Sequence, residues 1–281
     1  MKLMKPNLAG TVTDLATVKL PVLCTPKFDG IRATVQGGVV YSRTLKPIPN
    51  KNIQRIFGTP EYEGCDGELL VGDPTDIMCF RNTTSIVMSD DKDADEVEYQ
   101  VFDVLEPELV YGQRVYDKRV TVMPDIIETY ADLVKYEDDM VDKGWEGIIL
   151  RSATGKYKQG RSTPKEGGLL KYKRFFDAEA TITGWQPRYE NTNPKETNEL
   201  GRSKRSHKQA GMVALDTIGA LEVTWKGYEF AMGSGLDEDE AARLWEIRDK
   251  LPGMKVKFKY QLAAGVPRFP IYLAIRDKRD I

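Results

Sequence analysis

The sequence predicts an α+β fold in two parts: a domain of antiparallel sheets and helices, followed by a small β-barrel. The 281 residues are enough for two domains of ordinary size. Strand and helix patterns alternate as far as "LLKYKR", whereas short strand patterns with one helix pattern follow it. We therefore place the boundary at Arg174 and expect one domain over 1–174 and a second over 175–281.

The first domain shows a series of local signals. "IRATV" and "VVYSR" flank a glycine pair, which predicts a β-hairpin, and "NKNIQRIF" predicts a helix capped by its asparagine. "GCDGELLVG" and "EYQVFDVL" predict strands, and the second is apolar on both faces, which favours a central position in its sheet. A helix is expected after Pro124, with Gly144 as its end, and "EGIILR" predicts another buried strand.

The second domain is predicted to be built mainly of strands. "EATITGWQ", "GALEVTW", "YEFAMGS" and "KVKFKYQLA" show strand patterns, and "DEDEAARLWEIRDKL" predicts one helix. Such a set is typical of a small Greek-key barrel such as an OB-fold. The segment 186–211 has almost no apolar residues, so we expect a long polar, basic loop there.

Composition narrows the classes of function. With 41% hydrophobic and 30% charged residues and no apolar run near the length of a membrane span, we expect no membrane protein and no secretory signal. Three widely spaced cysteines predict free thiols in a reducing cytoplasm, not a disulfide framework or a zinc site. Because His207 is the single histidine, histidine-based catalysis is also disfavoured.

Basic residues are concentrated in two segments, although the net charge is −2. Segment 151–174 contains many lysines and arginines beside one acid, Glu166, and segment 202–208 has four basic residues and no acid. Acidic residues gather elsewhere, as in "SDDKDADEVE". This distribution favours a polyanion bound along one face, while either segment alone is equally typical of a solvated surface.

A short motif, "TPKFDGIR", suggests a reactive lysine, Lys27. Taken alone, K-x-D-G-x-R also fits a surface lysine beside a turn. Elements that the same chemistry needs follow it in order, however: "SR", "DGEL", "VFDVL", "EGIILR" and "LLKYKR". A nucleophilic lysine requires a lowered pKa, and nearby cations lower it. Lys171 and Lys173, two residues apart, would lie on one face of a strand and supply such cations.

This ordered series resembles the ATP-dependent DNA ligases, and most of all the small, two-domain bacteriophage type. These enzymes belong to the covalent nucleotidyltransferase superfamily, with RNA ligases and mRNA capping enzymes. The resemblance implies an ATP-grasp-like nucleotidyltransferase (adenylation) domain followed by an OB-fold β-barrel. It also implies nick sealing through a lysyl-AMP enzyme, an adenylated 5′-phosphate and attack by the 3′-hydroxyl.

The resemblance further implies the cofactors and partners. ATP would donate AMP with Mg²⁺ or Mn²⁺ as the metal, and the partner would be nicked double-stranded DNA. We expect a monomer in the cytoplasm, or in the host cytoplasm if a phage encodes it, with replication, repair or recombination as its context.

By the same resemblance, individual residues acquire expected roles. Lys27 would be the nucleophile, and Lys171 and Lys173 would stabilise the phosphoryl charge. Glu68 would contact the ribose and the metal, and Glu146 mainly the metal. Phe102 would stack on the adenine.

Further roles concern the phosphates and the nick. Arg32 and Arg43 would meet the 5′-phosphate, Asp29 would act near the 3′-hydroxyl, and Arg268, before "FP", would orient pyrophosphate. Arg276 and Lys278 are weaker candidates, because the family's Arg-x-Asp-Lys spacing is not kept. Thr25 and Pro26 would also line the nucleotide site, although many ligases carry at position 25 a glutamate that reads the adenine amino group. The residues expected to bind DNA are Arg32, Arg43, Arg151, Lys156, Lys158, Arg161, Arg202, Lys204, Arg205 and Lys208.

Two other interpretations stay open from the sequence. The first is an RNA ligase or a capping-type nucleotidyltransferase, which "RFP" and the short C-terminus disfavour. The second is a non-catalytic nucleic-acid-binding OB protein, which the full set of motif lysines and glutamates disfavours.

Overall fold

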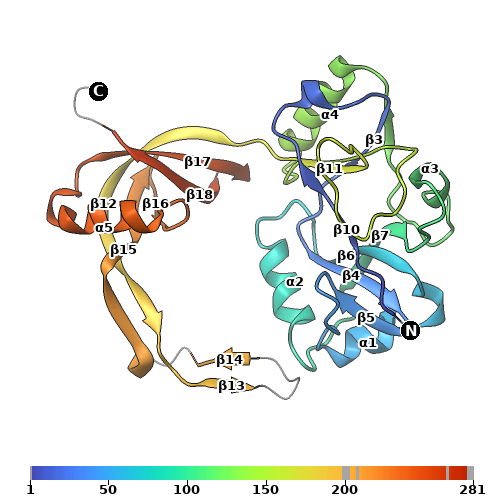
Figure 1. Cartoon of the computed structure of the whole chain (residues 1–281), viewed down its shortest axis with the longest axis horizontal. Coiled ribbons are helices and arrows are strands. Elements are labelled where there is room, and N and C mark those ends of the chain that lie inside the picture. Colours follow the sequence, from blue (N-terminus) through green and yellow to red (C-terminus); the bar gives the residue numbers. More distant parts are fainter. Residues whose placement is uncertain (1, 198–202, 207–208, 264–265, 277–281) are drawn as a thin grey trace. The chain divides into compact units, whose positions relative to one another are not determined.

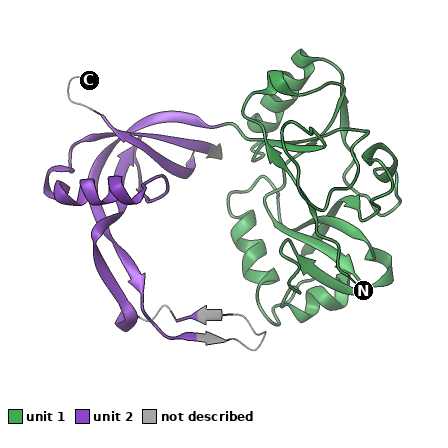
Figure 2. Cartoon of the chain, viewed as in Figure 1, with its two compact units in different colours: residues 1–174 green, residues 175–281 purple. Residues whose placement is uncertain are grey.

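The computed structural model describes residues 2–197, 203–206, 209–263 and 266–276 of the chain (Figure 1). The chain divides into two compact units, Met1–Arg174 and Phe175–Ile281 (Figure 2). Within the described residues, no helix combines the length and the apolar character that a membrane crossing requires.

The first unit contains a four-stranded antiparallel sheet in the order β5-β4-β6-β7. Helices α1 and α2 lie beside this sheet (Figure 1), and they contribute Ile53, Phe57 and Val87 to its apolar core. The elements are β4 (Ile31–Gln36), β5 (Val39–Ser42), α1 (Lys51–Phe57), β6 (Cys65–Val71), α2 (Cys79–Val87) and β7 (Val97–Val104).

A five-stranded sheet in the order β2-β11-β9-β3-β8 completes the first unit, and Leu133 and Met140 of α4 pack into its core. A short parallel pair, β1 with β10, also belongs to this unit. The elements are β1 (Asn7–Leu8), β2 (Gly10–Thr11), β3 (Val22–Pro26), α3 (Tyr111–Arg114), β8 (Asp125–Ile127), α4 (Tyr130–Asp142), β9 (Ile148–Arg151), β10 (Gly160–Arg161) and β11 (Leu169–Tyr172).

The second unit is a strongly paired antiparallel sheet in the order β16-β15-β12-β17-β18. The first and last strands of this order are joined by a bridge between Ser234, just after β16, and Ile271 on β18. In addition, the backbone N–H of Tyr272 donates to Ser234 O at 2.8 Å. The sheet therefore closes on itself as a barrel. Its elements are β12 (Phe176–Asn191), β13 (Lys195–Thr197), β14 (Ser203–Arg205), β15 (Met212–Trp225), β16 (Tyr228–Met232), α5 (Glu238–Glu246), β17 (Lys255–Ala263) and β18 (Val266–Ile275).

Local sequence signals explain several of these elements. Gly37 and Gly38 adopt φ of 60° and 71°, the left-handed conformation that a two-residue hairpin turn requires, and they connect β4 to β5. The Asn50 side chain accepts hydrogen bonds from the backbone N–H groups of Asn52 and Ile53, which caps α1 as predicted. Asp237 caps α5 in the same way through the N–H of Glu240.

Most of the described residues in the predicted polar loop over 186–211 lie in β-strands. β12 continues to Asn191 and pairs with β15 from Met212 onward, and β13 pairs with β14. We call this part, residues 186–215, the ribbon. Its strands satisfy their backbone hydrogen bonds by pairing with each other. Because most of their side chains are polar, the alternation of apolar and polar residues that signals a strand is absent, and the sequence predicts a loop instead.

Two other expectations in the first unit were wrong, and one helix was missed. Residues 125–127 form β8, paired with β3, and the helix begins only after its cap Thr129. Helix α2 was not predicted. β7 is an edge strand, not a central one, and it is buried because residues 121 and 122 donate backbone hydrogen bonds to Val101 O at 2.9 and 3.0 Å.

Candidate active site

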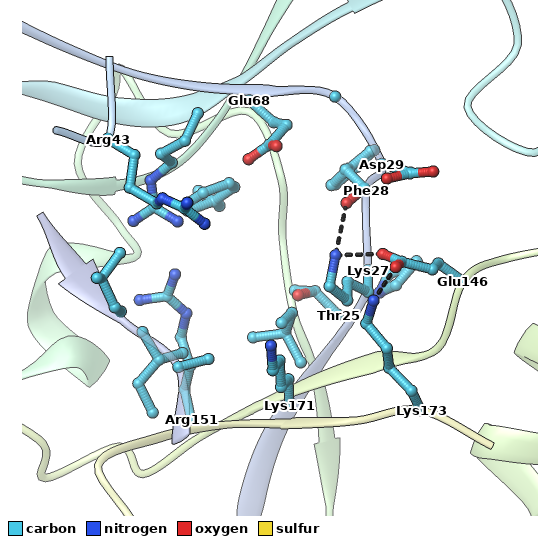
Figure 3. Close-up of a pocket in the computed structure, with 18 of the residues that line it drawn as sticks. Thr25, Lys27, Phe28, Asp29, Arg43, Glu68, Glu146, Arg151, Lys171 and Lys173 are labelled. Atoms are coloured by element: carbon cyan, nitrogen blue, oxygen red, sulfur yellow. Dashed lines mark hydrogen bonds and ion pairs between the residues drawn. The ribbon is translucent and has the colours of Figure 1, made fainter. Parts of the chain in front are cut away.

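A cavity of about 330 Å³ opens in the first unit where the two sheets meet (Figure 3). Strands β3, β9 and β11 of the five-stranded sheet contribute Thr25, Arg151 and Lys171 to its wall. Strands β4, β6 and β7 of the other sheet contribute residues that include Glu68 and Phe102. The motifs that are far apart in the sequence thus converge on one pocket.

Lys27 follows the last residue of β3. Its backbone N–H donates to Gly147 O at 2.9 Å, and its Nζ donates to Phe28 O at 3.1 Å. The same ammonium forms an ion pair with Glu146, and the two side chains are 20% and 5% exposed. Lys27 is therefore partly buried at the pocket wall and is oriented by a carboxylate.

Glu146 also pairs with the ammonium of Lys173, just beyond β11. Figure 3 shows the carboxylate between the ends of Lys27 and Lys173. Two lysines thus share one carboxylate, which leaves an excess of positive charge in this part of the pocket. An anionic ligand such as a phosphate would be attracted to it.

Gly30 of the motif is explained by a close approach of two strands. A Cβ at this position would lie 2.3 Å from Leu69 O and 2.5 Å from the Leu70 side chain. Only glycine lets the turn after Asp29 pass this close to β6. That approach brings Lys27 and Asp29 to the same pocket as Glu68.

The pocket shifts the pKa of two of its ionisable groups toward their neutral forms. Burial lowers the pKa of Lys171, and the nearby charges of Lys27, Arg161 and Arg43 lower it further. Burial raises the pKa of Glu68 to about 7, although the charges of Arg32 and Lys27 oppose this shift. The pocket is thus a partly desolvated site in which charges interact strongly.

Phe102 lies on the pocket wall with two guanidinium groups near its ring. The Cζ atoms of Arg32 and Arg151 are 4.4 and 5.2 Å from the ring centroid. Both distances are within the range of a cation–π contact. Phe102 itself is 8% exposed, so most of its ring is covered by the protein and only part of it faces the cavity.

Both of these arginines are held by buried aspartates. Arg32 donates to Asp66 through Nε and Nη2 at 2.6 and 2.7 Å. Burial alone would lower the pKa of Arg32, but Asp66 raises it above its usual range. Arg151 donates to Asp103 at 2.6 Å and is 4% exposed. The contact of Arg151 with a DNA backbone, predicted from the sequence, does not fit this burial.

The pocket brings together most of the residues predicted for nucleotide binding and catalysis. Arg43 is exposed, and Arg161 is exposed with its guanidinium donating to Ala9 O at 2.8 Å. The predicted residues that line the pocket are Thr25, Pro26, Lys27, Asp29, Arg32, Arg43, Glu68, Phe102, Glu146, Arg151, Arg161, Lys171 and Lys173.

Other predicted residues lie elsewhere. Lys156 and Lys158 are exposed and do not line the pocket, and Lys158 pairs with Glu166 at 2.6 Å. In the second unit, Arg268 lies on β18 with its guanidinium 4.9 Å from the Phe269 ring.

The remaining basic candidates belong to the second unit as well. Arg276 pairs with Glu179 at 2.5 Å, and the Arg205 guanidinium donates to Asn191 O. Lys204 lies on β14. Arg202, Lys208 and Lys278 lie outside the described residues.

Comparison with known proteins decides the family. The family model of a DNA ligase OB-like domain matches residues 212–276. The crystal structure of Chlorella virus DNA ligase-adenylate is similar to this chain at 33% identity. The match covers 98% of this chain and 100% of that one, with a TM-score of 0.54. The chain belongs to the ATP-dependent DNA ligases. The α+β prediction, with a nucleotidyltransferase domain before an OB-like domain, is therefore confirmed.

Another solved structure shares the fold of this ligase. A structure from a study of Lig E DNA ligases has a TM-score of 0.65 at 21% identity, and the match covers 98% of this chain and 100% of that one. A search of curated protein sequences found no match.

Sequence reasoning missed several residues of the ligase pocket. Phe80 lines the cavity from α2 and is 41% exposed. Asp66 and Asp103 are fully buried beneath the pocket and hold its arginines. Asp66 stands in the quoted "DGEL" and Asp103 in "VFDVL", so both belong to motifs that the sequence singles out. Phe80 belongs to a helix with no recognised start signal, because Met78 at its N-cap forms no side-chain cap.

The carboxylates of the pocket suit a Mg²⁺ ion that arrives with a nucleotide. Asp29, Glu68 and Glu146 all line the cavity. Among the described residues, no group of three or more histidines, cysteines, aspartates and glutamates is placed to hold a metal by itself. Mg²⁺ is commonly bound by one or two carboxylates together with substrate phosphates and water. The donors that are present fit this mode.

Proposed function

We propose that this ligase seals nicks in duplex DNA with ATP, through a covalent lysyl-AMP intermediate on Lys27. The observation that carries the proposal is the convergence of Lys27, Glu146, Lys173 and Lys171 on one pocket that also contains Glu68 and Phe102. A lysine nucleophile, several cations for a phosphoryl group and an aromatic wall for a base suit nucleotidyl transfer.

In the first step, Lys27 Nζ attacks the α-phosphorus of ATP. A P–N bond forms, the bond to the pyrophosphate oxygen breaks, and the nitrogen gives up its proton. A free amine at neutral pH costs roughly 4–5 kcal/mol for an ordinary lysine. Lys171 and Lys173 offset part of this cost by electrostatic repulsion, and they stabilise the negative charge on the phosphoryl oxygens. Glu68 and Glu146 would hold Mg²⁺, which neutralises phosphate charge when bound.

The base and ribose would be held on the opposite side of the pocket. Phe102 offers part of its ring for stacking on adenine, and Glu68 offers oxygens to the ribose hydroxyls. Thr25, which is 5% exposed, lines the same cavity, so we propose that it contacts the nucleoside.

Two further transfers complete the reaction. The 5′-phosphate of the nick attacks the AMP phosphorus and releases Lys27. The 3′-hydroxyl then attacks the adenylated 5′-phosphate and AMP leaves. Arg43 is exposed at the pocket and is the better candidate to meet the 5′-phosphate. Arg32 already uses Nε and Nη2 for Asp66, with Nη2 also donating to Asn7 O at 3.2 Å. Asp29 would orient the 3′-hydroxyl.

DNA would be held mainly through its phosphates by a monomer of this ligase. Exposed basic residues of the first unit, together with basic residues in the sequence of the ribbon, would supply positive charge without reading sequence. The proposed residues are Arg43, Lys156, Lys158, Arg161, Arg202, Lys204, Arg205 and Lys208.

Covalent labelling tests the proposal. The protein is incubated with α-³²P-labelled ATP and Mg²⁺ and run on a denaturing gel. We expect a label on the wild type, none on Lys27→Ala, and an unchanged label on Lys135→Ala, whose side chain is 74% exposed and outside the pocket. GTP in place of ATP, and nicked RNA in place of nicked DNA, should support little reaction. A wild type that stays unlabelled with either Mg²⁺ or Mn²⁺ would overturn the proposal.

A further inference from the structure

Two buried aspartates lie on paired strands beneath the wall of the pocket. Asp66 on β6 and Asp103 on β7 are register partners in the antiparallel ladder, and neither is exposed. Carboxylates buried on paired strands carry a large desolvation cost and repel each other unless cations accompany them. Each must therefore be compensated by cations of its own.

Arginines supply this compensation. Asp66 binds Arg32, and Asp103 binds both Arg114 and Arg151. Arg114 Nε donates to Asp103 Oδ1 at 2.7 Å, and Arg151 Nη1 donates to Oδ2 at 2.6 Å. The cluster contains three arginines and two aspartates, so an excess of one positive charge lies beside the pocket.

Arg114 differs from the other two arginines because it does not reach the pocket. It is 1% exposed at the end of α3 and donates to Leu109 O as well as to Asp103. An arginine this deeply buried has no route to a nucleotide or to DNA. Its contacts indicate that it fixes the Asp103 carboxylate in place.

Arg151 connects this fixed carboxylate to the pocket. Its Cζ lies 4.6 Å from the ring centroid of Tyr111 and 5.2 Å from that of Phe102. Its Nε is buried and has no hydrogen-bond partner among the described residues. The hydrogen bond from Nη1 to Asp103 therefore sets the position of this guanidinium near the two rings.

We propose that Asp103 and Arg114 are positioning residues for the nucleotide base. They hold Arg151 against Phe102, so that this ring keeps the orientation in which it can stack on adenine. The inference rests on the proposed function, in which Phe102 contacts the base. Neither Asp103 nor Arg114 lines the pocket, so both would act only through Arg151 and Phe102.

The substitution Asp103→Asn tests the inference. Asparagine has the same shape, but an NH2 donor replaces one of the two carboxylate oxygens. That group cannot accept from a guanidinium, so either the bond from Arg114 at Oδ1 or the bond from Arg151 at Oδ2 is lost. We expect the KM for ATP in self-adenylation to rise about tenfold, or ~1.4 kcal/mol in binding free energy. The rate at saturating ATP should change less than about twofold, since Lys27 and its partners are untouched.

Glu137→Gln is the matched control. Glu137 is also fully buried and paired with an arginine, Arg174, but it does not line the pocket. This variant should lose thermal stability as Asp103→Asn does, yet keep the wild-type KM for ATP. In the Phe102→Leu background, adding Asp103→Asn should raise the KM for ATP far less than the same substitution does in the wild type. The reason is that Asp103 affects the base only through Phe102.

The outcomes separate this inference from the proposed function. A wild type that never becomes labelled would overturn the function itself. A labelled wild type with an equal KM in Asp103→Asn and Glu137→Gln would overturn the positioning role alone. Additive effects of Asp103→Asn and Phe102→Leu would also overturn it. If Asp103→Asn does not fold, Arg151→Lys replaces it, because lysine keeps the charge but loses the planar fork that bridges Asp103 and the rings.

Discussion

The carboxylate of Glu146 binds the ammonium groups of both Lys27 and Lys173 (Figure 3). The nucleophile of the proposed reaction is therefore oriented by the same group that holds Lys173, one of the cations proposed to bind phosphate. Glu146 is 5% exposed, so water screens this arrangement weakly. The pocket depends on this one charge to keep two lysines close to each other.

Neutralising Glu146 should disable the first chemical step. In Glu146→Gln, two partly buried ammoniums face each other without a counter-charge and will move apart. We expect self-adenylation to fall about a hundredfold, the usual effect of losing one oriented electrostatic group. Rapid-quench measurement of label transfer checks this. Glu137→Gln serves as the control, because it is a buried carboxylate outside the pocket, and it should retain the wild-type rate. A Glu146→Gln variant with more than a tenth of that rate would contradict the prediction.

Glu68 should make the stability of the ligase depend on pH. Its pKa is raised from 4.5 to about 7 in the folded protein, mainly by burial. The folded state therefore keeps a proton that the unfolded chain loses above pH 4.5. The resulting stability is fully present below pH 4.5 and is lost as the pH rises through about 7.

Replacement of Glu68 removes this dependence. Relative to the wild type, Glu68→Gln should gain unfolding free energy between pH 5 and pH 8, by up to ~3 kcal/mol. Urea denaturation at a series of pH values measures the difference. Glu166→Gln is the control, because the pKa of Glu166 is instead lowered by its hydrogen bond with Lys158. If the difference in unfolding free energy between the wild type and Glu68→Gln stays constant over this pH range, the pKa of Glu68 is not raised in the folded protein.

Tyr157 should stabilise the fold through the buried carboxylate of Asp66. Its hydroxyl donates to Asp66 Oδ2 at 2.6 Å and accepts from the Asn7 N–H at 3.2 Å, and the residue is 4% exposed. Tyr157→Phe leaves both groups without this partner. We expect a loss of ~2–3 kcal/mol in the free energy of unfolding, measured in urea. Tyr116→Phe, at a residue that is 75% exposed, should change it by less than about 0.5 kcal/mol. Equal effects would contradict the prediction.

The sequence predicted those features that local patterns or ordered motifs determine. The glycine pair of the hairpin and the Asn50 cap act within a few residues, so their effect can be read directly. Lys27 and Glu146 were found because their motifs follow one another in a recognisable order. Their contact arises from the pairing of β3 with β9, in which Pro26 is the partner of Ile148.

The supports of the pocket could not be predicted in this way. Asp66 and Asp103 meet only through the register of β6 with β7, and that register includes a bulge next to Asp66. A shift of one residue would turn Asp103 to the other face of the sheet. For the same reason, the position of Arg151 in a basic segment predicts a DNA contact, whereas its side chain forms a buried ion pair with Asp103.

The ribbon should supply much of the salt-dependent affinity for DNA. It carries Lys204 and Arg205 on β14, and the sequence places Arg202 and Lys208 on either side. Each phosphate that the protein no longer neutralises reduces the slope of log K against log salt concentration by ~0.9. Replacing all four residues by glutamine should therefore weaken binding to nicked DNA and reduce this slope by up to ~3.6. Self-adenylation should survive, because Lys27, Glu146, Lys171 and Lys173 are unchanged.

A matched set of substitutions separates local contacts from net charge. Lys92, Lys118, Lys135 and Lys143 are exposed residues of the first unit and do not line the nucleotide pocket, so changing them to glutamine removes the same formal charge. If DNA is held by the ribbon, fluorescence anisotropy between low and high salt should show a reduced slope for the ribbon variant and a nearly unchanged slope for this set. Equal reductions would show that the ligase attracts DNA through its overall charge, since the position of the cations would then not matter.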